Sequence, residues 1–290
     1  MRPAIALLAL AMLASNGASA PGPVQRPLPA PALINGAPWQ AEIYSGVIYS
    51  KAELKGRAVW DMAHRCGGSY IAPHWILTAA HCFYLPNSDQ MSPWKENHWR
   101  IRLGARDISS GEGVTFLIDR VVIHPGFVHD GFKNDVALAH FVADDQSRAD
   151  YARHDSKHVA QIRLNDAPVG FGQPVSVSGW GKTKDDENAP TNADLESVTI
   201  HTVGCDWDPV YKGETNDNSL CAFGTGGRDA CHGDSGGPLI RAVGDPVLVG
   251  IVSWGHGCGE HPGVYVRIDR DHYLDWINRT IASADPGKAN

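Results

Sequence analysis

The residues with the clearest chemical potential are a histidine, an aspartate and a serine in three well-separated segments. His81, Asp135 and Ser235 occur in the sequences L-T-A-A-H-C, N-D-V-A-L and G-D-S-G-G-P-L. A serine hydroxyl becomes a strong nucleophile when a base removes its proton during attack. Imidazole titrates near neutral pH, so a histidine can take that proton and return it to a leaving amine, while an aspartate on the far ring nitrogen fixes the tautomer. Together the three residue types could activate the serine as a nucleophile and return its proton to a leaving group.

Taken together and in this order, the three segments resemble the trypsin/chymotrypsin-like serine peptidases. Each segment alone has an ordinary structural explanation, such as a histidine beside a cysteine or a glycine-rich turn. Supporting motifs make the resemblance specific over Leu33 to Ser283, and these motifs are Cys66–Ser69, Gly179–Gly181, Ser253–Gly255, Pro262–Tyr265 and Trp276–Ile277. The resemblance implies a serine endopeptidase with His81, Asp135 and Ser235 as its catalytic residues.

The resemblance also assigns the groups that meet the negative charge of the reaction intermediate. The backbone N–H groups of Gly233 and Ser235 would form the oxyanion hole, where losing one donor in a comparable site costs about 2.7–4 kcal/mol. Glycine suits position 233 because a Cβ could obstruct the close approach of the backbone. Ser253 resembles a serine that lies beside the catalytic aspartate, and we include it among the residues expected around the bound substrate.

Asp229 lies six residues before Ser235, where the family has the floor of the pocket for the side chain that precedes the cut. A carboxylate buried there is costly without a partner, so it would select a substrate guanidinium or ammonium. Gly255 and Gly263, on the matching walls, leave room for a long side chain. We therefore expect cleavage after Arg or Lys. Ala230 offers no hydroxyl beside the carboxylate, which favours Arg because its forked guanidinium can bond the carboxylate directly.

Short runs of alternating apolar and polar residues dominate the chain that must position these groups. Runs such as 99–103, 174–178 and 264–268, each bounded by turn residues, are typical of an antiparallel all-β protein. The resemblance is more specific than the pattern. It implies two six-stranded antiparallel β-barrels, at approximately 33–150 and 151–272, with the active site in the cleft between them.

Two regions depart from the strand pattern. A C-terminal amphipathic α-helix at approximately 272–283 is predicted by residues at helical spacing, which are Tyr273, Trp276, Ile277, Thr280 and Ile281. The segment 143–158 is charged and lacks periodicity, so we interpret it as a connection. His154 and His158 within it are four residues apart, but a metal site usually needs a third or fourth ligand, and we interpret them as solvated.

The N-terminus has the three-part layout of a secretory signal. A basic residue precedes an apolar run at 4–14, and Ala18-Ser19-Ala20 provides an A-x-A site, which predicts a signal peptide at 1–20. The apolar run is shorter than the roughly 20 residues that span a bilayer. Prolines crowd the next segment, so 21–32 is interpreted as a pro-segment or linker and 33–290 as the peptidase domain. We expect a secreted protein, or a periplasmic one if the source is a Gram-negative bacterium.

The start of the peptidase domain bears on activation. Zymogens of this family are commonly cut after a basic residue, and the new amine pairs with the aspartate before the nucleophile. Leu33 would supply that amine here and Asp234 that carboxylate. Ala32 is not basic, and Arg26 is followed by Pro27. We therefore expect processing by a peptidase that prefers small residues rather than self-activation.

The chain has six cysteines, an even number that favours disulfides in an exported protein, although fifteen pairings are open by count. Neither C-x-x-C nor H-E-x-x-H occurs, so a zinc site is not indicated. The resemblance implies the pairs Cys66–Cys82, Cys205–Cys221 and Cys231–Cys258. We expect no cofactor and no metal; in the stretch that aligns with the family's calcium loop, Ala105 replaces a carboxylate, and calcium requires several oxygen ligands.

The composition limits the classes of partner that the protein is expected to bind. The 290 residues carry a net charge of −7, which gives no electrostatic basis for binding nucleic acid or an anionic membrane. We expect protein or peptide substrates, proteinaceous peptidase inhibitors as further partners, and a monomer. Two alternatives remain open: a catalytically inactive relative used as a binding module, and a secreted β-rich adhesin. Inactive relatives usually lack a triad residue, and an adhesin gives no reason for the three motifs.

Overall fold

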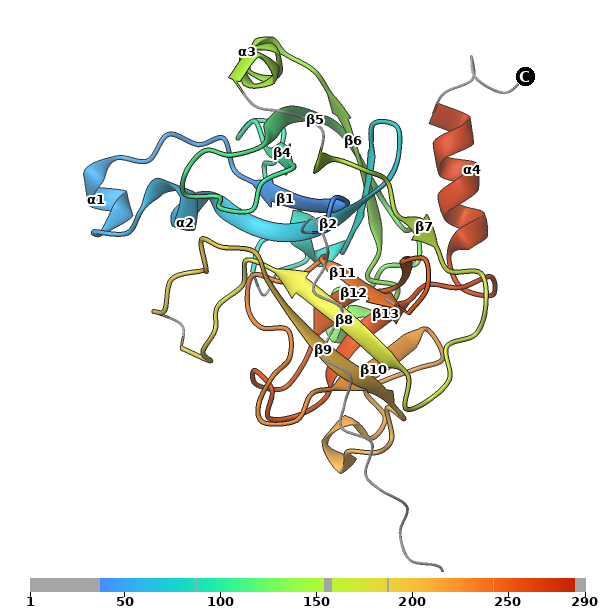
Figure 1. The fold of residues 1–290 in the computed structure, drawn as a ribbon. Coiled ribbons are helices and arrows are strands. Elements are labelled where there is room, and N and C mark those ends of the chain that lie inside the picture. The colour runs from blue at the N-terminus through green and yellow to red at the C-terminus, as the bar shows by residue number, and fades with distance from the viewer. Residues whose placement is uncertain (1–36, 87, 154–157, 187, 242, 285–290) are drawn as a thin grey trace, which may run out of the picture.

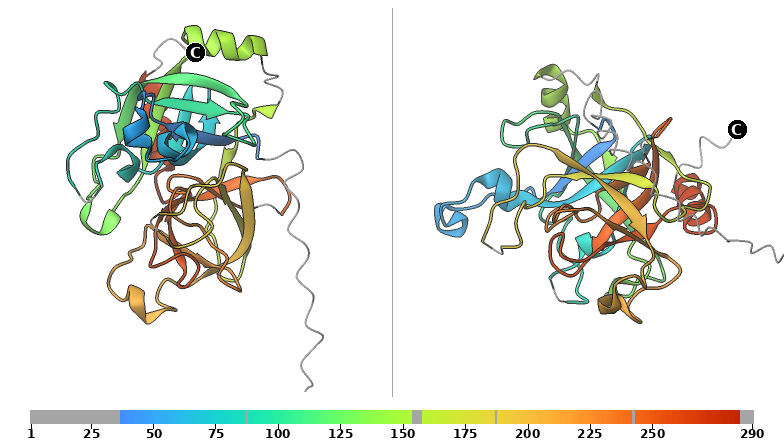
Figure 2. Two further views of the ribbon diagram at one scale, coloured as in Figure 1. Left: turned by 90° about the vertical axis from the view of Figure 1, so that its left-hand side faces the viewer. Right: turned by 60° about the horizontal axis from the view of Figure 1, so that its bottom comes forward.

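The structure is a computed structural model that describes residues 37–284 except 87, 154–157, 187 and 242. The expected signal peptide, the pro-segment and Leu33 lie outside the described residues. Two barrels lie one above the other in Figure 1, and the left view of Figure 2 separates them clearly. Within the described part of the chain, no helix is long and apolar enough to cross a membrane.

Six antiparallel strands close the first barrel in the order β1-β2-β3-β6-β5-β4. Their bounds are β1 (Gln40–Tyr44), β2 (His64–Ala72), β3 (Trp75–Thr78), β4 (Arg100–Leu103), β5 (Val114–Ile123) and β6 (Ala137–Val142). Buried apolar side chains fill the interior, among them Ile43, Ile76, Ile101, Phe116 and Phe141. The end of β3 pairs with the start of β6, at Thr78 and Ala137. This register brings the segment after β3, with His81, beside the segment before β6, with Asp135.

The second barrel closes through a pairing of β11 with β12 in the ring β11-β8-β9-β10-β13-β12. Its strands are β8 (Pro174–Gly179), β9 (Glu196–Val203), β10 (Ser219–Phe223), β11 (Pro238–Arg241), β12 (Val247–Trp254) and β13 (Gly263–Arg267). A short strand β7 (Arg163–Leu164) adds to β12 in parallel. The predicted fold class, two six-stranded antiparallel barrels with a C-terminal helix, is confirmed; β7 is an addition that the pattern did not predict.

Helix α4 (Leu274–Ala284) is the predicted C-terminal helix, which begins and ends within two residues of the expected bounds. Its Ile277 is fully buried in the core cluster that also fills the first barrel, and Leu274, Trp276 and Ile281 pack against that cluster. The helical spacing of these residues therefore reflects one apolar face. Figure 1 shows α4 standing beside the upper barrel.

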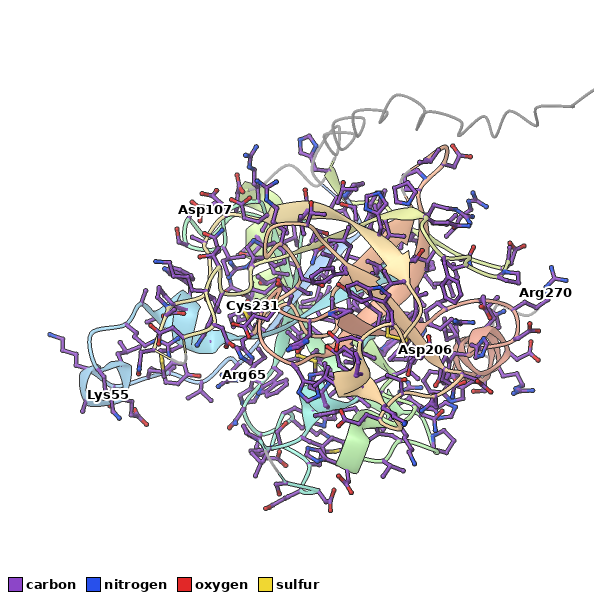
Figure 3. The ribbon with its side chains drawn as sticks, turned by 90° about the horizontal axis from the view of Figure 1, so that it is seen from below. Lys55, Arg65, Asp107, Asp206, Cys231 and Arg270 are labelled. Atoms are coloured by element: carbon purple, nitrogen blue, oxygen red, sulfur yellow. A yellow bond between two sulfur atoms is a disulfide. The ribbon has the colours of Figure 1, made fainter. Side chains whose placement is uncertain are left out.

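Two short helices, α1 (Lys51–Leu54) and α2 (Val59–Ala63), occupy the connection between β1 and β2. Ser50 and Glu53 form a reciprocal capping box that begins α1. Trp60 of α2 packs against a small buried cluster that includes Ile108 and Trp180. The connection extends away from the barrels, with Lys55 at its outer end in Figure 3, yet α2 is anchored to the second barrel's side of the molecule.

The segment interpreted as a connection joins the two barrels and contains a helix, α3 (Asp145–Arg153), which its lack of periodicity did not predict. The helix lacks a strong apolar face, and its start is fixed by hydrogen bonds at its N-terminus. The Asp144 carboxylate accepts hydrogen bonds from the backbone N–H and the hydroxyl of Ser147, both at 2.9 Å, which is a side-chain N-cap. His154 lies outside the described residues, and His158 is exposed.

Asp144 also pairs with Arg100 on β4, which predicts a pH-dependent contribution to stability. Burial acts to raise the pKa of Asp144, but the bonds from Arg100 and Ser147 outweigh it and lower the pKa to about 2. A lowered folded-state pKa contributes stability that is present above the ordinary value and is lost as pH falls through the folded value. We expect Asp144→Asn to remove about 2 kcal/mol at pH 6 and almost nothing at pH 2. Urea unfolding at the two pH values measures this, and an equal loss at both would contradict it.

Candidate active site

Asp135 is fully buried just before β6, and three hydrogen bonds converge on its carboxylate. Oδ1 accepts the backbone N–H of His81 at 2.8 Å, and Oδ2 contacts Nδ1 of His81 at 2.7 Å and accepts the Ser253 hydroxyl at 2.6 Å. Burial acts to raise the pKa of Asp135, but attraction to His81 and these hydrogen bonds lower it below its ordinary value. The aspartate is therefore held as an anion against one ring nitrogen of His81.

The turn that presents Asp135 is held in an unusual backbone conformation. Asn134 has φ of 52°, in the left-handed region that asparagine tolerates better than most residues. Its side chain fixes the turn, because it donates to the Gly126 carbonyl at 2.7 Å and accepts from Asn218 and from Tyr273 at 2.9 and 2.8 Å. These bonds tie the turn to the second barrel and to the segment that leads into α4.

His81 begins a short 3-10 helix, η1 (His81–Phe83), three residues beyond β3. The disulfide between Cys66 and Cys82 joins this helix to β2. Phe132, at the end of η2 (Asp130–Phe132), lies with its ring edge-on to the imidazole, with 5.3 Å between the ring centroids. The carboxylate on one side and the phenyl ring on another therefore define the orientation of the imidazole.

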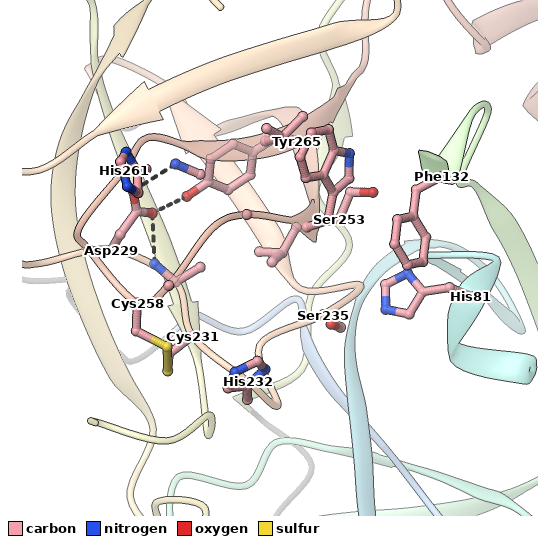
Figure 4. Close-up of a pocket in the computed structure, with 18 residues that line it drawn as sticks. His81, Phe132, Asp229, Cys231, His232, Ser235, Ser253, Cys258, His261 and Tyr265 are labelled. Carbon is pink, nitrogen blue, oxygen red and sulfur yellow. Dashed lines mark hydrogen bonds between the residues drawn. A yellow bond between two sulfur atoms is a disulfide. The ribbon is translucent and has the colours of Figure 1, made fainter. Parts of the chain in front are cut away.

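Ser235 lies in a tight loop before β11, and backbone hydrogen bonds hold the loop on both sides. Its carbonyl accepts the N–H of Gly67 on β2 at 2.8 Å, and the N–H of Gly236 donates to Val252 on β12 at 2.8 Å. Ser235 and His81 line the same pocket, as Figure 4 shows. No hydrogen bond joins their side chains among the described residues, and such contacts often tighten only when substrate binds.

Gly233 has φ of +100°, and a Cβ there would lie 3.0 Å from the Cα of Gly181. Both the conformation and the space therefore require glycine. The next residue, Asp234, accepts hydrogen bonds from the backbone N–H groups of Gly181 and Cys231, at 2.8 and 2.9 Å. Desolvation raises the pKa of Asp234 in spite of these bonds. Its expected partner Leu33 lies outside the described residues.

Asp229 lies at the end of the pocket opposite His81 in Figure 4. The pocket encloses about 350 Å³, enough for a long side chain. Oδ1 of Asp229 accepts from the Tyr265 hydroxyl at 2.6 Å and from the Ala230 N–H at 2.7 Å, and Oδ2 accepts from the Gly263 N–H at 3.0 Å. Desolvation raises the pKa of Asp229, and these hydrogen bonds act against the increase. A cationic ligand would stabilise the anion further.

The structure brings together the residues expected around this pocket, whose lining includes Asp229, Ala230, Ser235, Ser253, Gly255 and Gly263. Tyr265 belongs to the Pro262–Tyr265 motif, but no role was predicted for it. The signal was available, because Gly263 and Tyr265 are two residues apart on β13 and so face the same side of the strand. Phe132 was missed, and nothing in its local sequence indicates that it contacts His81.

All six cysteines form disulfides in the pairing that the resemblance implies, Cys66–Cys82, Cys205–Cys221 and Cys231–Cys258. Two groups of potential metal ligands occur in the described residues, and each includes cysteine sulfur, Cys66 and Cys82 beside His81 in one and Cys258 in the other. Disulfide sulfur is not a thiolate and is a poor metal ligand. The described residues therefore offer no set of three free ligands in either group.

Comparisons with known proteins define the class. A family model described as Trypsin matches residues 30–277. Trypsin of Squalus acanthias is 35% identical over 240 residues, which is 79% of this chain and 93% of that protein. Transmembrane protease serine 5 of Homo sapiens is 34% identical over 81% of this chain, which spans about half of that protein, 52%. The solved structure of neuropsin, a serine protease of mouse brain, has a TM-score of 0.64 at 26% identity and covers 85% of this chain and 96% of its own.

The chain belongs to the trypsin-like serine peptidase family. It is accordingly a serine-type endopeptidase, a hydrolase whose substrates are proteins or peptides.

Proposed function

We propose that this peptidase cleaves after Arg or Lys, with His81, Asp135 and Ser235 as its catalytic triad. The observation that carries the specificity is the Asp229 carboxylate in a cavity of about 350 Å³ that Ser235 also lines. Burial of this carboxylate makes its uncompensated charge costly, so a substrate cation gains from neutralising it. Ala230 contributes its backbone N–H to Asp229 and no hydroxyl, which supports a preference for Arg over Lys because Arg can bond the carboxylate directly.

The proposed mechanism uses these residues in the following order. As the Ser235 oxygen bonds to the substrate carbonyl carbon, its proton passes to His81, and Asp135 stabilises the imidazolium that forms. The carbonyl electrons move to oxygen, where the N–H groups of Gly233 and Ser235 meet the charge. Collapse of the intermediate expels the amine, which takes the proton from His81. Water then attacks the acyl-enzyme by the same steps and releases the acid.

The same proposal covers maturation and location. The signal at 1–20 and the three disulfides support secretion, with the peptidase acting as a monomer that proteinaceous inhibitors can block. A pro-segment at 21–32 keeps the enzyme a zymogen until cleavage between Ala32 and Leu33 frees an amine for Asp234. Desolvation of Asp234 supports this step, because a buried carboxylate gains from a cationic partner. N-terminal sequencing of the active enzyme checks it, and a start elsewhere than Leu33 would contradict it.

A covalent label and a substrate profile together test the activity. We expect diisopropyl fluorophosphate to modify the mature protein at Ser235 and to leave Ser235→Ala unmodified, because only an activated serine reacts quickly. Without labelling of the mature protein, an inactive binding relative would explain the chain instead. A peptide library then reports the preferred residue before the cut, and turnover of Phe or Leu peptides at least equal to that of Arg peptides would reject the specificity.

A further inference from the structure

Two side chains that the mechanism does not use lie beside Gly233. Nε2 of His64, on β2, lies 2.9 Å from the Gly233 carbonyl oxygen. The methyl group of Thr191 lies 3.3 Å from where a Cβ on Gly233 would be. Glycine permits the conformation of residue 233, with φ of +100°, but does not favour it over others. Neighbouring groups must therefore hold it.

The first support is a buried network of charged side chains behind His64. Nδ1 of His64 lies 3.2 Å from Oε1 of Glu42, and the two side chains are 1% and 2% exposed. Nε of Arg102 lies 3.4 Å from the other carboxylate oxygen of Glu42. A carbonyl oxygen only accepts hydrogen bonds, so the bond to Gly233 requires a proton on Nε2. Glu42 occupies Nδ1, which leaves Nε2 to donate to Gly233.

Several charges act on His64. Burial lowers its pKa, but the hydrogen bond and the attraction to Glu42, together with the Gly233 carbonyl and the charge of Asp234, outweigh burial and raise it. The edge of Trp180 is the neighbouring aromatic group, with 6.4 Å between the ring centroids. Nothing in this environment removes the proton from Nε2.

The second support comes from α2. Asp61 is 4% exposed, and its Oδ1 accepts hydrogen bonds from both the backbone N–H and the hydroxyl of Thr191, each at 2.9 Å. Arg57 holds the same carboxylate with two bonds, at 2.7 and 2.8 Å. The bonds between Asp61 and Thr191 join residues that are 130 positions apart in the chain. They fix Thr191 where its methyl group borders Gly233.

We propose that two buried carboxylates, Glu42 and Asp61, are positioning residues for the oxyanion hole. Glu42 acts through His64 on the carbonyl of Gly233, and Asp61 acts through Thr191 on its Cα side. Together they hold the loop conformation in which the Gly233 N–H can meet the substrate oxyanion. The proposal rests on the proposed function, in which Ser235 attacks and Gly233 is a donor. It gives the connection between β1 and β2 a part in catalysis, although that connection extends away from the pocket.

The test compares a peptide aldehyde with the alcohol of the same sequence, taken from the best cleaved peptide. With the aldehyde, the Ser235 oxygen bonds to the carbonyl carbon, the carbonyl electrons move to oxygen, and the serine proton passes to His81. That oxygen then requires the oxyanion hole, whereas the alcohol binds the same pockets and has no carbonyl. The ratio of the two inhibition constants therefore measures how well the oxyanion hole stabilises the bound aldehyde. Unfolded molecules bind neither inhibitor, so they do not affect the ratio.

We expect Glu42→Ala and Asp61→Ala each to weaken the aldehyde about tenfold, which is less than the loss from deleting an oxyanion donor itself. Binding of the alcohol should stay within about twofold. Glu42→Gln and Asp61→Asn should keep most of the aldehyde affinity. The glutamine amide can donate to Nδ1 while Nε2 keeps its proton, and the asparagine oxygen can still accept from Thr191.

Asp269→Ala is the matched control, because Asp269 is 2% exposed and its carboxylate contacts His272 at 2.6 Å in the connection between β13 and α4. An unchanged ratio in both alanine variants, or an equal fall in Asp269→Ala, would overturn the proposal. A wild-type enzyme that binds the aldehyde no better than the alcohol would instead refute the proposed function. Thus the two failures give different results.

Discussion

With Asp135 in the proposed triad, we expect Asp135→Asn to lower kcat about 10⁴-fold, the size of effect that a histidine in the wrong tautomer has in this class of peptidase. The reason lies in the hydrogen bonds that the two carboxylate oxygens of Asp135 accept. Oδ1 accepts the backbone N–H of His81, so an asparagine must keep its oxygen there. Its NH2 group then replaces Oδ2 and donates to Nδ1 of His81 instead of accepting from it. The ring proton moves to the nitrogen needed for Ser235, and the base is lost.

Steady-state kinetics on the best cleaved peptide measure this effect, with little change in KM because Asp135 is not in the substrate pocket. Asp119→Asn is the matched control, since its carboxylate contacts Nδ1 of His140 at 2.6 Å on the outside of the first barrel. The control should leave kcat within about twofold. If kcat of Asp135→Asn fell by less than about tenfold, the assignment of His81 as the base would be untenable.

The sequence predicts the catalytic pocket better than it predicts what surrounds the pocket. His81, Asp135 and Ser235 lie within short local motifs that can be recognised one at a time. The pairing of Thr78 with Ala137 then places the motif of His81 beside that of Asp135. The alternation that predicts strands such as β4 arises because one face meets the core and the other meets solvent. These are local signals, so one sequence is enough to show them.

Glu42 shows why the supports behind the oxyanion hole escape such analysis. Residues 40–43 of β1 alternate between polar and apolar types, yet all four are buried, with 2%, 0%, 1% and 0% exposure. The polar face of this strand therefore meets other protein groups and not solvent. From the sequence alone, a glutamate in such a strand is predicted to be exposed, because the groups that neutralise its charge are not visible. Those partners, His64 and Arg102, are more than twenty residues away in the chain. Asp61 and Thr191 are joined over a still longer separation, and no local pattern encodes that contact.

Three of the helices could not be predicted from the sequence, for a different reason. Helix α3 begins because Asp144 caps it and not because its residues form an apolar stripe, and a periodicity search detects only the stripe. Helices α1 and α2 have four and five residues, too few for a period to be visible. Helix α4 has both the length and the apolar face, and it is the helix that the sequence predicts.

With Asp229 as the proposed cation-binding group, we expect Asp229→Asn to lower kcat/KM for Arg peptides about 10³-fold, because leaving a buried charge without its partner costs about 3–5 kcal/mol. The asparagine oxygen can still accept from Tyr265 and from the Ala230 N–H. Its NH2 group then faces the Gly263 N–H and the substrate guanidinium, which are all donors. The loss therefore combines a missing charge with an unfavourable contact. Peptides with Leu before the cut have no charge to lose, and their kcat/KM should change by less than about tenfold.

The comparison of Arg and Leu peptides separates specificity from catalysis, since both peptides use the same nucleophile. Glu260→Gln is the matched control, because Glu260 is exposed and is not among the residues that line the cavity, so the change removes one negative charge near the cavity and leaves its floor intact. It should lower kcat/KM for Arg peptides by less than about threefold, the effect of a screened surface charge. Labelling of Ser235 by diisopropyl fluorophosphate should persist in Asp229→Asn. If the label is kept and Arg peptides are still preferred by the wild-type margin, the cation is recognised by some group other than Asp229.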